Sequence, residues 1–125
     1  MALTIPDTEY EAGMEMARSA YAALGLTNDL YSWDKERKAS KLAGRDYVFN
    51  AIWVIMEEYQ TDEEHAKELC KEQIRMHISE FVEVVKKAKT DSKLSSDLRL
   101  YLEALLYSYS GNLAWSISCP RYKVK

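Results

Sequence analysis

Three oxygen-bearing side chains, Asn28, Ser32 and Glu36, lie at intervals of four residues. On an α-helix each such step advances about 6 Å and drifts by roughly 40°, so the three side chains share one face. An amide carbonyl, a hydroxyl and a carboxylate form an all-oxygen donor set, which suits a hard cation such as Mg²⁺. About half of an octahedron would remain for water and phosphate oxygens. The same spacing also fits the solvated polar face of a surface helix.

A row of this kind requires a helix, and the sequence predicts four of them. Apolar residues recur at helical spacing, and no strand pattern survives. A capping box at Thr61–Glu64 opens the third helix, and Ser95 or Ser96 caps the fourth. We therefore expect an all-α fold made of one domain, residues 1–125. The predicted helices cover about residues 5–39, 45–59, 61–89 and 95–118, with a short connection over 40–44 between the first two.

Composition limits the classes of partner and the compartment. The formal net charge of -3, without a basic stripe, gives no attraction for nucleic acid, so we expect no nucleic-acid partner. No apolar run approaches the ~18 residues that a membrane span needs. Two cysteines without CxxC spacing indicate a reducing compartment. Residues 1–10 lack the basic and apolar regions of a secretory signal, so we expect a cytoplasmic protein.

The end of the sequence carries a second set of residue types that suit a phosphorylated ligand. Arg121 offers a guanidinium fork and Tyr122 a phenol, and both donate to phosphate oxygens. A basic residue near the end of a helix is also common without any ligand. Six residues before the arginine, Trp115 presents an indole face that attracts cations, although core packing explains a tryptophan equally well.

The stretch Asn28–Glu36, NDLYSWDKE, resembles the NDxxSxxKE metal motif of fungal class I terpene cyclases. Every fixed position is present, including Lys35. The preceding residues 22–27, AALGLT, are similar to the apolar helix that leads into the motif there. The pair Arg121 and Tyr122 resembles the terminal Arg-Tyr pair of the same family.

The resemblance implies roles for particular residues. Asn28, Ser32 and Glu36 would ligate one Mg²⁺, and Asp29 would support them without being a ligand. Lys35 and the C-terminal pair Arg121–Tyr122 would contact the diphosphate of the substrate. Trp115 would line the cavity that holds cationic intermediates. The implied fold is the C-terminal four-helix part of the class I terpenoid synthase α-bundle.

The implied activity is Mg²⁺-dependent cyclisation of a linear prenyl diphosphate, with release of diphosphate. The match is best to the cyclase domains of fungal bifunctional di- and sesterterpene synthases, which implies a C20 or C25 substrate. The family's aspartate-rich motif is missing from this sequence. Because ionisation of the substrate needs several cations acting together, we expect this chain to be a C-terminal fragment that is inactive alone.

A second class of function stays open, that of a helical interaction module derived from a terpene synthase without catalysis. Apolar faces left uncovered by missing helices would favour association. The partner would be the N-terminal part of a cyclase or a second copy of the chain, as a homo-oligomer.

Overall fold

The computed structural model describes the backbone of residues 5–118 and the side chains of residues 5–109 and 111. The prediction of an all-α fold is confirmed: the described residues form four α-helices and no strand. A short 3₁₀ turn, Asp7–Glu9, precedes the first α-helix. The helices are α1 (Tyr10–Leu42), α2 (Ala51–Tyr59), α3 (Glu63–Thr90) and α4 (Ser96–Ser118).

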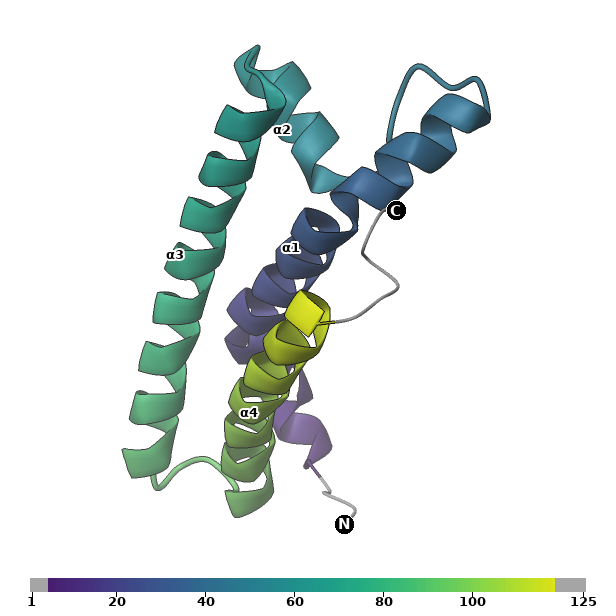
Figure 1. Ribbon diagram of the computed structural model, residues 1–125. Coiled ribbons are helices and arrows are strands. Elements are labelled where there is room, and N and C mark those ends of the chain that lie inside the picture. Colours follow the sequence, from purple (N-terminus) through teal and green to yellow (C-terminus); the bar gives the residue numbers. More distant parts are fainter. Residues whose placement is uncertain (1–4, 119–125) are drawn as a thin grey trace.

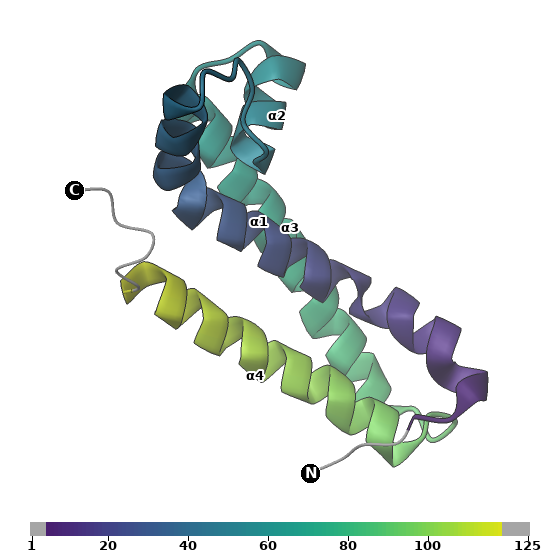
Figure 2. The same ribbon diagram turned by 90° about the vertical axis from the view of Figure 1, so that its right-hand side faces the viewer.

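Three long helices form the body of the molecule, and the short α2 lies at one end of it (Figure 1). α1 packs against both α3 and α4, and α2 packs mainly against α3. Figure 2 shows that α1 runs from the end of the bundle where α3 passes into α4 to the loop at residues 43–50 at the other end. Among the described residues, no helix is both long enough and apolar enough to cross a membrane.

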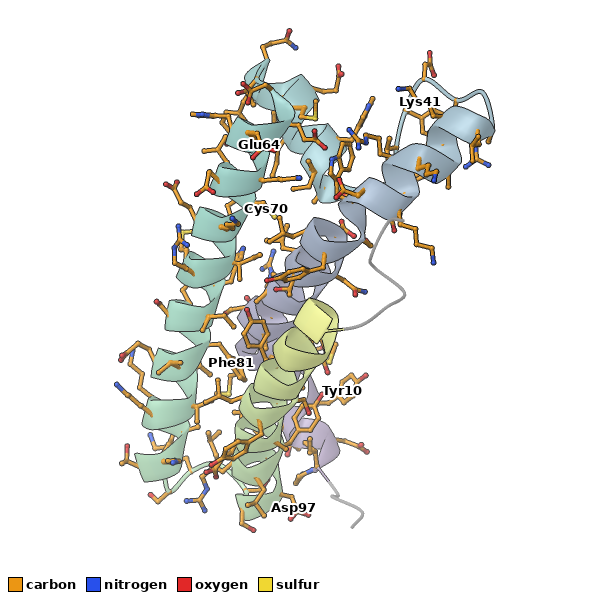
Figure 3. All side chains as sticks on the ribbon, viewed as in Figure 1. Tyr10, Lys41, Glu64, Cys70, Phe81 and Asp97 are labelled. Carbon is orange, nitrogen blue, oxygen red and sulfur yellow. The ribbon has the colours of Figure 1, made fainter. Side chains whose placement is uncertain are left out.

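Two groups of buried side chains hold the helices together. At the α2 end, α1 and α3 bury a cluster with α2 and with Tyr109 of α4, and at the other end they bury a second cluster with α4. Phe81 is fully buried and projects from α3 toward α4 (Figure 3). The first cluster includes Ala23, Trp33, Ile52, Ile55, Ala66, Cys70, Ile74 and Tyr109; the second includes Ala17, Ala20, Phe81, Val85, Ala88, Leu98 and Leu102.

α1 ends three residues later than predicted, at Leu42, and Gly44 explains where it stops. Gly44 has a φ of +71°, a left-handed conformation that costs a glycine little. The Gly44 N–H donates to the Lys41 carbonyl, and the Arg45 N–H donates to the Ser40 carbonyl. This pair of bonds is the Schellman arrangement that ends many helices. Residues 40–42, expected in the connection, are therefore helical.

The second helix begins six residues later than predicted, because Asn50 caps it. Asn50 is extended (φ −161°, ψ 143°), and its side-chain oxygen accepts a hydrogen bond from the Ile52 N–H. Val48 lies outside the helix, yet it packs against the first buried cluster. Its apolar character therefore reflects core packing in a loop and not helical periodicity, so the prediction of helix over 45–50 was wrong.

Caps also set the starts of the last two helices. Asp62 caps α3, accepting a hydrogen bond from the His65 N–H, so the cap lies one residue after the predicted Thr61. The Ser95 hydroxyl accepts from the Leu98 N–H at the start of α4, in agreement with the prediction for that helix.

Candidate metal centre

The predicted ligand row lies on one unbroken helix. α1 is helical throughout residues 10–42, so Asn28, Ser32 and Glu36 keep the four-residue spacing on which the prediction depends. Asn28 is exposed at one end of the row, and Glu36 is half-buried at the other. Ser32, in the middle, is only 7% exposed. Lys35 is exposed beside Glu36. Solvent therefore reaches both ends of the row, and Ser32 is its most buried member.

Glu36 is held by a residue that the sequence prediction missed. The side-chain amide of Asn50 donates a hydrogen bond of 2.6 Å to Oε2 of Glu36. The same nitrogen donates to the backbone carbonyl of Asp29 at 2.8 Å. Asn50 thus joins the start of α2 to two points in the predicted metal motif. An asparagine directly before an apolar run is a helix-start signal, so its capping role could have been found in the sequence.

The second link between the motif and α2 is made by Asp29. Its Oδ2 accepts a hydrogen bond of 2.8 Å from the Ala51 N–H, the first residue of α2. Burial raises the pKa of the Asp29 carboxyl; the hydrogen bond from Ala51 opposes this rise, and the negative charge of Glu36 adds to it. Oδ2 of Asp29 is thus engaged with the backbone at the start of α2.

Trp33, directly after Ser32, ties α1 to the start of α3. It is 3% exposed, and its indole N–H donates to the carboxylate of Glu63. Arg37, one turn further along α1, approaches the same carboxylate at 3.4 Å. The side of α1 that carries the motif is therefore fixed to both α2 and α3.

The donor set fits a hard divalent cation. Within the described part of the chain, no group of three or more His, Cys, Asp and Glu side chains could hold a metal. A cation here would therefore depend on amide and hydroxyl oxygens together with Glu36, a set that suits Mg²⁺ better than a soft metal. Asp29 and Glu36 also repel each other, and a bound cation would relieve that repulsion.

A cavity of about 200 Å³ opens beside Glu36. Arg45 gives it a positive charge, and Phe49, which is 86% exposed, forms part of its wall. The loop at residues 43–50 therefore places one cation and several apolar atoms next to the predicted ligand. The lining consists of Glu36, Ala39, Ser40, Arg45, Tyr47, Val48 and Phe49.

The predicted diphosphate-binding residues Arg121 and Tyr122 are close to the end of the chain. Arg121 and Tyr122 lie outside the described residues. Trp115 lies on the described backbone of α4, but its side chain is not described. The structure thus brings Asn28, Ser32 and Glu36 onto one helix face, adds Asn50 to them, and leaves the second half of the predicted site open.

Comparison with known proteins identifies the family. Residues 1–80, more than half of the chain, match the family described as terpene synthase family 2, C-terminal metal binding. The matched region contains the whole candidate metal centre, including Asn50.

Relatives match almost the full chain. It is 48% identical over 122 residues to fusicoccadiene synthase of Phomopsis amygdali, covering 98% of this chain and 17% of that protein. It is 51% identical over 122 residues to a bifunctional type I diterpene synthase of Aspergillus flavipes, covering 98% of this chain and 16% of the relative. A bifunctional sesterterpene synthase of Aspergillus aculeatus is 43% identical over 121 residues, 97% of this chain and 17% of the relative. The chain therefore spans about one sixth of these relatives, and it belongs to the terpene synthase family as a C-terminal metal-binding region.

Proposed function

We propose that this chain forms one wall of a class I terpene synthase site and binds Mg²⁺ through Asn28, Ser32 and Glu36. The observation that carries the proposal is the geometry of Glu36. It lies in register with two oxygen donors on one helix, and Asn50 holds one of its carboxylate oxygens. Family membership supports a divalent metal in this region. The hardness of the donors favours Mg²⁺ among the divalent ions.

The diphosphate of the substrate is the second ligand that we propose. Lys35 is exposed on α1 and lies seven residues after Asn28, within roughly 20° of it around the helix, and its ammonium group would contact a diphosphate oxygen. Arg121 and Tyr122 are proposed to add a guanidinium and a phenol donor to the same group. Because the chain as a whole carries a net charge of -3, binding of an anion depends on these local cations.

The proposed parent reaction is cyclisation of a linear C20 or C25 prenyl diphosphate. The bond between the allylic carbon and the diphosphate oxygen breaks, and the electron pair leaves with diphosphate. The carbocation closes rings through its own double bonds, and loss of a proton from the final cation gives the neutral product. Asn28, Ser32 and Glu36 would hold Mg²⁺, which would supply positive charge to the leaving diphosphate. Lys35 and Arg121 add positive charge to the leaving group, and Trp115 offers an indole face to the carbocation.

We propose that the chain needs a partner for turnover. It contains no aspartate-rich motif, so the ions that the opposite wall would hold have no ligands here. α1 exposes apolar side chains along one face: Tyr10 is 63%, Met14 49% and Tyr21 44% exposed. At 3.6 residues per turn these three lie within roughly 40° of each other and of Asn28. The proposed partner, the N-terminal part of a cyclase, would cover this face.

The exposed face also favours the second candidate, a non-catalytic module that assembles into homo-oligomers. Association through exposed apolar surface does not depend on Mg²⁺ or diphosphate. Light scattering with and without Mg²⁺ and diphosphate separates the two functions. Assembly that is indifferent to both ligands would support the module.

Calorimetric titration with inorganic diphosphate tests the proposed function. We expect binding that requires Mg²⁺ and is lost in Glu36→Ala. The matched control is Glu72→Ala, which removes an exposed carboxylate from α3 and should bind as the unaltered chain does. Binding that is independent of Mg²⁺, or unaffected by Glu36→Ala, would contradict the proposal.

A further inference from the structure

We propose that Asn50 is a positioning residue for Glu36, which sets the carboxylate in the orientation that binds the cation. This inference rests on the proposed metal-binding function. It concerns a residue on a different element from the ligand row, 14 positions beyond Glu36 in the sequence.

The side chain of Asn50 is engaged at both ends. Its oxygen accepts from the Ile52 N–H at 2.8 Å, and its nitrogen donates to Glu36 Oε2 at 2.6 Å and to the Asp29 carbonyl at 2.8 Å. The residue is only 5% exposed. An amide with both donors and its acceptor in use cannot rotate without losing a bond, so it is a rigid reference point for the carboxylate.

Capping alone does not account for an asparagine at this position. Serine and aspartate cap a helix about as well, because the cap needs only a side-chain oxygen. The contact with Glu36 needs a donor as well, which aspartate lacks. The side-chain nitrogen of Asn50 therefore has a role that is separate from capping α2.

A hydrogen bond to one carboxylate oxygen of Glu36 also limits the positions that the other oxygen can take. With Oε2 of Glu36 held by Asn50, rotation of the carboxylate is restricted and Oε1 would be the oxygen that binds the cation. Asp29 keeps Asn50 in place, because its carboxylate accepts from the neighbouring Ala51 N–H. Partners that orient a metal-binding side chain typically account for about 10- to 100-fold in metal affinity.

The substitution Asn50→Ser tests the inference, because serine keeps the capping oxygen and removes the amide donor. Mn²⁺ alone is the probe, and its binding to the full chain is followed by electron paramagnetic resonance. We expect Mn²⁺ affinity to fall by about tenfold or more. Ser95→Ala is the matched control: it removes the cap of α4 at the opposite end of the bundle from α2, and should lower thermal stability while leaving Mn²⁺ affinity unchanged.

Measuring Asn50→Ser in a second variant, Glu36→Asp, distinguishes an effect on the orientation of the carboxylate from an effect on folding. In Glu36→Asp the shorter carboxylate cannot reach the Asn50 amide, so adding Asn50→Ser should cost much less affinity than it does in the unaltered chain. An equal loss in both backgrounds, or an Mn²⁺ affinity unchanged by Asn50→Ser, would overturn the inference while leaving the metal site standing. Absence of Mn²⁺ binding by the unaltered chain would overturn both the inference and the proposed function.

Discussion

Replacing Gly25 with alanine should stabilise the chain, although the position lies three residues before the first proposed ligand. Gly25 is exposed in the interior of α1, and a Cβ built there meets no atom within 4 Å. The substitution therefore adds no clash and removes the entropic penalty of a helical glycine, which is roughly 0.5–1 kcal/mol. For a chain of this size that gain raises the melting temperature by about 2–5 °C.

Gly13→Ala is the matched comparison on the same helix. A Cβ at Gly13 would lie 3.1 Å from Cδ1 of Leu98, a fully buried side chain of α4. The same helical gain is then offset by overpacking, which typically costs about 1–3 kcal/mol. We expect Gly13→Ala to be neutral or destabilising. Urea unfolding followed by circular dichroism measures both variants.

The contrast between the two glycines reports on the exposed face of α1. Gly25 lies close to Tyr21 and Asn28 on the helix surface. If Gly25→Ala destabilised the chain by 1 kcal/mol or more at every protein concentration, the space beside Asn28 would be filled, and the reasoning would be refuted. Destabilisation that grew with protein concentration would instead place a second copy on this face.

Three further predictions concern the core and the caps. Burial raises the pKa of Cys70 to about 11, with a smaller contribution from the negative charge of Asp29. Because the unfolded thiol ionises near 9, the unfolding free energy of a Cys119→Ser chain should fall from pH 9 to 11, and Cys70→Ala should remove that part of the fall. Gln60 ends α2 with a φ of +50°, so Gln60→Gly should raise stability by about 1 kcal/mol in urea titrations. Phe81→Ala should cost about 3–5 kcal/mol in the same titrations, because the ring is fully buried.

The ligand row could be predicted from sequence because it depends on one helix alone. Spacing of four residues determines which side chains share a face wherever the backbone is regular, and α1 is regular through Asn28, Ser32 and Glu36. The all-α fold followed for a similar reason, because helical periodicity is a local property.

Asn50 could not be assigned to the site from the sequence alone. Its contact with Glu36 requires the chain to reverse direction at Gly44 and return along the end of α1. Helical periodicity over 45–59 hid that reversal, because Val48 is apolar for a reason unrelated to a helix. The indole bond from Trp33 to Glu63 was missed on the same grounds, since it joins two elements that only the fold brings together.

The most direct test of the account is where a paramagnetic cation binds. In an amide-resolved NMR spectrum, substoichiometric Mn²⁺ should broaden the signals of Asn28, Ser32 and Glu36 first, together with that of Asn50, and should spare Ala88 at the far end of α3. Broadening centred on any other part of the chain, or none at all, would contradict the proposal that this helix face binds a divalent metal.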